Sequence, residues 1–292
     1  MAHIPVLTKE VLEYLNIRPG SRIIDATLDG GGHARAILAA QPEAKVLGIE
    51  WDPKLFEEVS AGLKDKANMI LVNDSYTNLA RIIQEHDFIP DGIIFDLGLS
   101  SWHYENSGRG FSFQRDEYLD MRFNPESGEP DASQFINTAS REDLEMAIRE
   151  YGEEGFSRQI ADAIIQARRT KPITKTGELV EVISRAVPDW YKHKKLHFAT
   201  KTFQALRIAV NHELENVEKG VGAAIEALKP GGRLVVISFQ GLEDKVVKNI
   251  FREKNKEGIV KFVVKGTVKP SWAETKTNPR ARSAKMKVVE KT

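Results

Sequence analysis

Five short apolar runs, rich in β-branched residues, recur along this chain of 292 residues. They are "RIIDAT" (22–27), "KVLGIE" (45–50), "MILVND" (69–74), "GIIFDL" (92–97) and "RLVVISF" (233–239). Helix-like segments separate the first four runs. Nearly continuous apolar strands that alternate with helices are typical of a parallel sheet covered on both faces, because each crossover must pass over the sheet. The pattern predicts an α/β fold with a doubly wound sheet.

A long insertion separates the fourth and fifth runs, which have 135 residues (98–232) between them. Residues 140–169, with Ser140 as N-cap candidate, and residues 174–187 have helical patterns. Residues 200–232 are predicted as a helix that returns the chain to the sheet and stops at Pro230-Gly231-Gly232. We therefore expect a core of residues 1–104 and 202–292, interrupted by a mainly helical domain of residues 105–201.

Composition narrows the possible chemistry. The chain has no cysteine, which excludes disulfides, thiolate metal sites and a cysteine nucleophile. Neither a leader peptide nor an apolar run near the ~20 residues of a membrane span is visible, so we expect a cytoplasmic protein with no membrane association. Residues 252–292 hold twelve Lys/Arg against four Asp/Glu. This excess is consistent either with a surface that faces a polyanion or with a solvated tail.

A glycine turn follows the first predicted strand, in the stretch "DATLDGGGH" (25–33). Glycine lets the backbone adopt unusual conformations and lets a ligand approach closely, and the helix N-terminus behind it offers unpaired N–H groups to an anion. The turn does not fit G-x-G-x-x-G, because Arg35 occupies the sixth position counted from Gly30, and no G-x-x-x-x-G-K-[ST] loop occurs. These features favour a carboxylate or phosphate but not a nucleoside triphosphate.

Acidic and polar residues end the next strands: Glu50, then Asn73-Asp74, then Asp96. The carboxyl ends of parallel strands share one edge of the sheet, so these residues should line one crevice. S-adenosylmethionine fits it, with its carboxylate at the glycine turn, its ribose at Glu50 and its adenine at the third and fourth strand ends. The alternatives are a plain tight turn and, for Glu50, a solvated strand end.

Nine stretches, taken together and in order, resemble the bacterial 16S ribosomal RNA cytosine-N4 methyltransferases across essentially the whole chain. They are "HIPVLTKEV" (3–11), "GGH" (31–33), "FDLGLSS" (95–101), "RGFSF" (109–113), "LDMRF" (119–123), "YGEE" (151–154), "TKTFQALRIAVNHEL" (200–214), "ISFQGLEDKVVK" (237–248) and "NPRARSA" (278–284).

The resemblance implies a class I methyltransferase core, an inserted substrate-recognition domain and S-adenosylmethionine as cofactor. It also implies a substrate, the N4 amine of a cytosine in the decoding region of 16S ribosomal RNA, within the small ribosomal subunit. The family's cofactor contacts fall on Gly31, Gly32, His33, Glu50, Tyr76, Asp96 and His103. The sequence departs from the family pattern chiefly on the cofactor side: Asp29 replaces a glycine, Glu50 an aspartate and His103 a glutamine, and "SFQGLEDK" replaces "SFHSLEDR".

Asp96 is the candidate catalytic residue. A cytosine amine is a poor nucleophile because its lone pair is delocalised into the ring, so a neighbouring carboxylate that accepts its proton would assist the reaction. Hydrogen bonding to the cofactor is an equally open role for Asp96. Methyl transfer to nitrogen is a direct in-line displacement that depends on alignment. The missing cysteine excludes the C5 route through a thiolate adduct.

RNA contacts are expected from aromatic and cationic side chains. Trp102, Tyr104, Phe111 and Phe113 could wall the base pocket or belong to the core, and "WYKHKKLHFATKTFQALR" (190–207) mixes aromatic residues with lysines. Helical spacing places Arg207 and Asn211 on one face. The candidate RNA-binding residues are Arg109, Phe111, Phe113, Lys201, Arg207, Asn211, Arg280 and Arg282.

Two other functional classes stay open from the sequence. The same core could methylate another RNA, DNA or a protein, or the chain could be an inactive RNA-binding factor of ribosome assembly. No histidine pairing typical of a metal site occurs, so no metal is expected. The sequence does not indicate the oligomeric state, the exact nucleotide, or whether naked RNA is a substrate.

Overall fold

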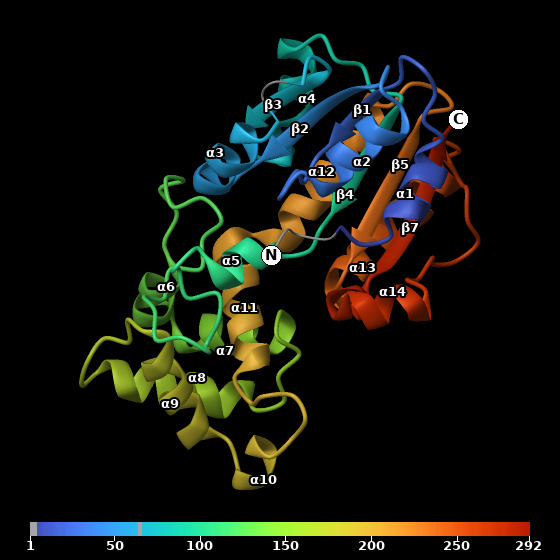
Figure 1. Cartoon of the computed structure of the whole chain (residues 1–292). Coiled ribbons are helices and arrows are strands. Elements are labelled where there is room, and N and C mark those ends of the chain that lie inside the picture. The colour runs from blue at the N-terminus through green and yellow to red at the C-terminus, as the bar shows by residue number, and fades with distance from the viewer. Residues whose placement is uncertain (1–4, 64–65) are drawn as a thin grey trace. The chain divides into compact units, whose positions relative to one another are not determined.

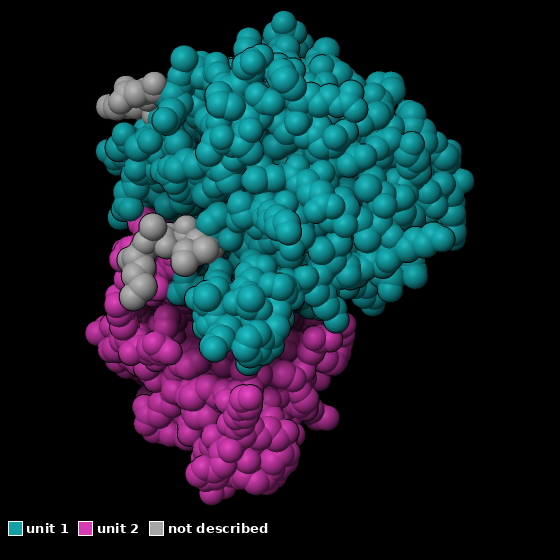
Figure 2. All heavy atoms as spheres, turned by 45° about the vertical axis from the view of Figure 1, so that its right-hand side comes forward, with its two compact units in different colours: residues 1–100, 214–292 teal, residues 101–213 magenta. Residues whose placement is uncertain are grey.

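The computed structural model describes residues 5–63 and 66–292. The chain divides into two compact units: unit 1 comprises residues 1–100 and 214–292, and unit 2 comprises residues 101–213 (Figure 2). An inserted unit was expected, and the unit boundaries follow Ser100 and Glu213. The domain limits drawn from the sequence, after residues 104 and 201, stay a prediction.

Unit 1 contains one sheet, which has seven strands within the described ranges. The strands are β1 (Arg22–Asp25), β2 (Lys45–Glu50), β3 (Met69–Asn73), β4 (Gly92–Asp96), β5 (Arg233–Ser238), β6 (Val260–Phe262) and β7 (Lys285–Lys291). Their order is β3-β2-β1-β4-β5-β7-β6, with β1 to β5 parallel and β7 antiparallel to both neighbours (Figure 1). This is a mostly parallel sheet. The five apolar runs are confirmed as its parallel strands, and β6 and β7 were not predicted.

Helices cover both faces of this sheet, which confirms the doubly wound prediction. On one face, α1 (Thr8–Leu15), α2 (Gly32–Ala40) and α3 (Pro53–Ala61) bury apolar side chains against alternate strand residues such as Ile23 and Val46. On the other, α4 (Leu79–Glu85), α12 (Glu213–Ala227) and α13 (Gly241–Lys256) pack against Ile24 and Leu47. The two-residue period of a strand thus supplies two separate apolar cores.

The basic C-terminal segment is divided between sheet and surface. β7 pairs with β5 and β6, and Lys287 in β7 is buried beside Asp244 of α13, to which its Nζ donates. Burying an ammonium group is costly unless a partner compensates for the lost hydration, and Asp244 supplies that partner. Exposed cations of the segment lie in α13 and β6 and around α14 (Trp272–Thr277) and the 3-10 turn η2 (Pro279–Ser283).

Unit 2 is helical, as expected of the insertion. Its helices are α5 (Ser101–Glu105), α6 (Ala132–Thr138), α7 (Arg141–Glu150), α8 (Ser157–Arg168), α9 (Thr176–Ala186), α10 (Asp189–Lys192) and α11 (Thr200–Asn211). Ser140 is confirmed as the N-cap of α7, where its Oγ accepts a hydrogen bond of 3.0 Å from the backbone N–H of Asp143. The capping oxygen satisfies one of the free N–H groups at the helix start.

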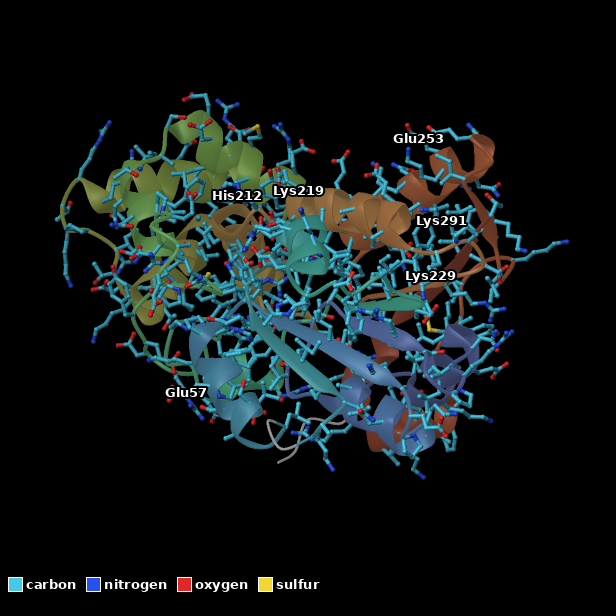
Figure 3. All side chains as sticks on the ribbon, turned by 90° about the horizontal axis from the view of Figure 1, so that it is seen from above. Glu57, His212, Lys219, Lys229, Glu253 and Lys291 are labelled. Carbon is cyan, nitrogen blue, oxygen red and sulfur yellow. The ribbon has the colours of Figure 1, made fainter. Side chains whose placement is uncertain are left out.

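The single helix predicted for residues 200–232 is wrong. His212, labelled in Figure 3, adopts a left-handed conformation with φ 49° between α11 and α12. The local reason is the set of contacts around it: Asn211 hydrogen-bonds back to the carbonyl of Arg207, and Glu213 binds the Arg207 guanidinium.

Among the helices of the described residues, none is long and apolar enough to cross a membrane.

Candidate active site

Six of the predicted cofactor residues lie at one edge of unit 1, where the parallel strands β1 to β4 end. Glu50 and Asp96 are the last residues of β2 and β4, and Tyr76 begins the 3-10 turn η1 (Tyr76–Asn78) after β3. Gly31, Gly32 and His33 form the turn into α2 after β1. The sheet topology therefore brings these six together, as the strand-end argument predicted. His103 belongs to unit 2.

The glycine turn is built from left-handed residues. Asp29 has φ 49° and Gly31 has φ 72°, and the Gly31 N–H donates to the Leu28 carbonyl at 2.7 Å. A Cβ on Gly31 would lie 2.8 Å from Leu63 Cδ1, and one on Gly32 would lie 2.9 Å from Pro5 Cγ. Both positions thus require glycine. Aspartate tolerates the left-handed region better than most residues, so Asp29 keeps the turn shape that a glycine would give.

Glu50 holds the turn in place. Its Oε2 accepts a hydrogen bond of 2.9 Å from the Asp29 N–H, and its Oε1 accepts one of 2.8 Å from the Asp52 N–H. Burial raises the pKa of Glu50 to about 8, and the Asp29 carboxylate adds to the rise. The carboxyl group therefore sits at the end of β2 with its orientation fixed from both sides, and the remaining lone pairs can accept hydroxyl donors.

A cluster of three titratable groups lies beside the turn. His33 Nε2 is 3.3 Å from Asp96 Oδ2, and both oxygens of Asp25 at the end of β1 are fully buried. Within residues 5–63 and 66–292, Asp25 Oδ1 and Oδ2, His33 Nδ1 and Asp96 Oδ1 have no hydrogen-bond partner. Buried polar atoms are nearly always paired, so this cluster is shaped for a polar ligand.

Burial and neighbouring charges shift the pKa values of Asp25 and His33. Burial raises the pKa of Asp25 to about 7, although the nearby His33 opposes part of that rise. Burial alone would lower the pKa of His33, but its hydrogen bond to Asp96 and the charges of Asp96 and Asp25 outweigh this and raise it. A cationic ligand that reached this cluster would be attracted by two carboxyl groups and would favour the ionised form of Asp25.

In unit 2, His103 lies in a cluster of aromatic rings. The His103 ring centroid is 5.1 Å from that of Phe111 and 5.2 Å from that of Phe123, and the two phenylalanine rings stack at 5.7 Å. The Arg109 guanidinium lies 5.6 Å from the centroids of both Trp102 and Phe111. His103, which was predicted to contact the cofactor, therefore lies beside Arg109 and Phe111, which were predicted to contact RNA.

The polar groups of Arg109, Asn211 and Arg207 are engaged within unit 2. Arg109 Nη1 donates to the carbonyls of Arg122 and Phe123 at 2.8 and 2.9 Å. Asn211 is 1% exposed and binds backbone atoms of residues 121 and 123. Arg207 forms a two-pronged ion pair with Glu213, with distances of 2.7 and 2.9 Å. Their predicted RNA contacts stay predictions.

The other RNA candidates are spread over both units. Phe113 stacks on His197 at 4.5 Å and meets Phe203 edge-on, and Lys201 Nζ donates to the Glu153 carbonyl. Tyr104 is exposed, as are Arg280 and Arg282 in η2 of unit 1. In the lysine-rich stretch of unit 2, Trp190 is 60% exposed, and Lys194 Nζ lies 4.8 Å from its ring centroid.

Two residues that belong to these clusters, Asp25 and Phe123, were not predicted from the sequence. The signal for Asp25 was present, because it ends an apolar strand directly before the glycine turn in "DATLDGGGH". Phe123 stands in the quoted stretch "LDMRF", but only the fold reveals that it stacks on Phe111.

Comparison with known proteins places the whole chain in one family. The model of the MraW methylase family matches residues 1–292. A relative named "Ribosomal RNA small subunit methyltransferase H" from Nitrosococcus oceani is 41% identical, covering 99% of this chain and 97% of the relative. Proteins of the same name from Thermosipho melanesiensis (43% identical; 99% and 97% covered) and Persephonella marina (39% identical; 99% of each covered) agree. The family resemblance of the motifs is thereby confirmed, and the chain belongs to the MraW methylase family.

Proposed function

We propose that this chain methylates the N4 amine of a cytosine in the decoding region of 16S ribosomal RNA, within the small ribosomal subunit and in the cytoplasm. The enzyme is a methyltransferase, and S-adenosylmethionine is its methyl donor. The choice of substrate rests on sequence similarity: over 99% of its length, the chain is similar to relatives that are named for the small-subunit RNA. The strand-edge geometry of unit 1 supports the chemistry.

The residues at the strand edge fit this cofactor, which supplies a methyl group on a positively charged sulfur. The turn at Gly31 and Gly32 has no room for a side chain and would receive the cofactor's carboxylate. Asp25, whose two carboxyl oxygens lack partners among the described residues, and Asp96, whose Oδ1 lacks one, would attract its ammonium and sulfonium charges. Glu50 would accept hydrogen bonds from the ribose hydroxyls, and the Tyr76 ring, 5.3 Å from Phe95, would contact the adenine.

Asp96 is our proposed acceptor for the amine. Its Oδ1 has no hydrogen-bond partner in the described part of the chain and can accept an N–H of the cytosine amine. That bond pulls electron density toward nitrogen and favours attack on the methyl group. His33 Nε2, 3.3 Å from Asp96 Oδ2, steadies the carboxylate, and Asp96 Oδ1 takes up the proton released from the amine after transfer.

We propose that unit 2 recognises the RNA around the target base. Beside the buried Phe111, the half-buried rings of Phe113 and Phe123 would receive an unstacked base. The lysine-rich stretch with the exposed Trp190 and Lys194 offers phosphate contacts. The sequence-based domain limits, after residues 104 and 201, enter here as part of the same proposal.

The decisive experiment is methyl transfer from tritiated S-adenosylmethionine to three acceptors: unmodified small subunits, protein-free small-subunit RNA and duplex DNA. We expect label in the subunits, and mass mapping should locate it on a decoding-region cytosine as N4-methylcytosine. Label in DNA alone, or at another RNA position, would contradict the proposal.

A calorimetric titration with S-adenosylmethionine tests the remaining alternative, an inactive RNA-binding assembly factor. We expect saturable binding with one site. Absence of binding at millimolar cofactor, together with retained binding of small-subunit RNA, would favour the inactive factor and reject the methyltransferase.

A further inference from the structure

The most exposed of the large apolar side chains of the described residues is Trp272 in α14, with 77% of its surface accessible. Lys276, one helical turn later, places its Nζ 5.2 Å from the Trp272 ring centroid. An indole this exposed contributes little to the core. Its contact with an ammonium group suits a surface that binds a flat aromatic ring beside negatively charged groups.

The excursion of residues 269–284, which contains Trp272, lies at the active edge of unit 1. β7 runs antiparallel to β5, and its first residue, Lys285, pairs with Ser238, the last residue of β5. Asp96 ends β4 at the same edge, since β4 and β5 are parallel and Asp96 pairs with Ile237. In Figure 1, α14 accordingly lies beside the start of β7. The fold therefore places the excursion on the side of the sheet that holds the candidate active site.

The excursion is fastened to the glycine turn. Glu274 Oε1 accepts a hydrogen bond of 2.7 Å from the Leu7 N–H, and Pro5, two residues earlier, packs so closely on Gly32 that a Cβ there would meet it at 2.9 Å. Ala281 and Ala284 are buried in the core that α1 and α2 share. These contacts hold the backbone of the excursion in a defined conformation, which fixes the positions from which its exposed side chains project.

The exposed charge of this region has one sign. Residues 263–284 contain five cationic side chains and one acid, Glu274, which is the anchor to Leu7. All five cations are exposed: Lys265, Lys269, Lys276, Arg280 and Arg282. Arg280 and Arg282 flank the buried Ala281, and both are exposed.

We propose that the excursion 269–284 is an RNA-binding surface on which Trp272 stacks with an unpaired base while the surrounding cations bind the phosphates beside it. Aromatic stacking on an exposed ring within a cationic surface is how proteins hold single-stranded nucleic acid without reading its sequence. A strand held here would approach the sheet edge that carries Asp96. The inference rests on the proposed function, because it takes RNA as the substrate.

The test uses the full chain and two probes, a fluorescently labelled single-stranded oligocytidylate and protein-free small-subunit RNA. Trp272→Ala should weaken binding of the oligonucleotide about 5- to 100-fold, the range expected when one stacked base is lost. The dependence of binding on salt should not change, because no cation is removed. Lys276→Ala should instead reduce the slope of log affinity against log salt by about 0.7.

Two variants serve as controls. Trp272→Phe keeps a ring and should bind within about threefold of the wild type. Phe262→Ala removes another exposed ring of unit 1, in β6, and should leave binding unchanged. RNA should also quench the wild-type tryptophan fluorescence, and this quenching should be smaller in Trp272→Phe.

The outcomes separate this inference from the proposed function. If Trp272→Ala binds RNA with wild-type affinity and the wild-type enzyme methylates small subunits, the stacking proposal is wrong and the proposed function stands. Weakened methylation of subunits with unchanged affinity for both RNA probes would assign the surface to a protein component and likewise overturn it. Failure of the wild-type enzyme to methylate any ribosomal acceptor would reject the proposed function, whatever Trp272 does.

Discussion

Replacing Asn211 by alanine tests whether this residue acts as a structural clamp. Asn211 is 1% exposed; its Oδ1 accepts the Phe123 N–H at 2.7 Å, and its Nδ2 donates to the carbonyls of Met121 and Arg207 at 2.8 and 2.9 Å. Alanine would leave a backbone donor and a backbone acceptor of residues 121–123 without these partners. A buried polar group that loses its partner costs about 1–3 kcal/mol, so we expect a loss of about 2–4 kcal/mol.

The loss should be concentrated in the segment that carries Arg109 and Phe123. Met121 has φ 61°, a left-handed conformation that costs a residue with a side chain about 1–2 kcal/mol and must be held by its surroundings. Without the Asn211 clamp this segment should relax, and the Arg109 guanidinium, which donates to the carbonyls of Arg122 and Phe123, should lose its fixed acceptors.

Urea unfolding combined with hydrogen exchange measures both effects. The Phe123 amide should exchange at least about tenfold faster in Asn211→Ala, which corresponds to about 1.4 kcal/mol of local stability. Asn211→Asp is the matched variant: it keeps an acceptor for Phe123 but turns a carboxylate oxygen toward the carbonyls of Met121 and Arg207, so at neutral pH it should destabilise at least as much as alanine. A loss below about 0.5 kcal/mol, with reduced RNA affinity, would refute the clamp and favour a direct RNA contact.

Three further predictions concern unit 1. Asp96→Asn should slow methyl transfer about 10²- to 10⁴-fold in single-turnover assays while cofactor affinity stays within tenfold; wild-type rates would remove Asp96 from the mechanism. Gly32→Ala should cost about 1–3 kcal/mol and weaken cofactor binding in calorimetry because its Cβ meets Pro5 at 2.9 Å, whereas Gly222→Ala in α12, with nothing within 4 Å, should be neutral or stabilising. The folded protein retains the Asp25 proton between the ordinary pKa of 3.8 and about 7, whereas the unfolded chain has lost it. This group alone should make stability fall by about 1.4 kcal/mol per pH unit across that window, and in urea titrations of Asp25→Asn the decline should be shallower by about that amount, because the raised pKa of Glu50 still contributes its own decline. An unchanged slope in that variant would show that another group titrates.

The parallel sheet and its active edge were predictable because each depends on local sequence. An apolar run of five or six β-branched residues between helical segments favours a buried parallel strand, and the residue that ends such a strand has a fixed place at the sheet edge. Glu50 and Asp96 were located in this way. The left-handed turn at Gly31 was likewise foreseen from composition, since few residues other than glycine adopt that conformation.

The features that were missed depend on contacts between distant residues. β7 reads "KMKVVEK", in which lysines interrupt the apolar pattern, and only Asp244 in α13 allows Lys287 to be buried there. The break at His212 has no glycine or proline to announce it. Asn211 shared a predicted helix face with Arg207, but its partners at residues 121 and 123 lie far away in sequence. Periodicity carries no information about such pairs.

The interruption of unit 1 by unit 2 has a consequence for synthesis on the ribosome. β4 is made with β1 to β3, but its other neighbour, β5, follows only after 136 residues. At about 5–20 residues per second, β4 waits roughly 7–27 s with unpaired backbone groups along one side. Unit 2, a single continuous segment, can complete its own fold during that delay. Premature termination within it would release a half-sheet with an open edge, the kind of species that aggregates and that chaperones retain.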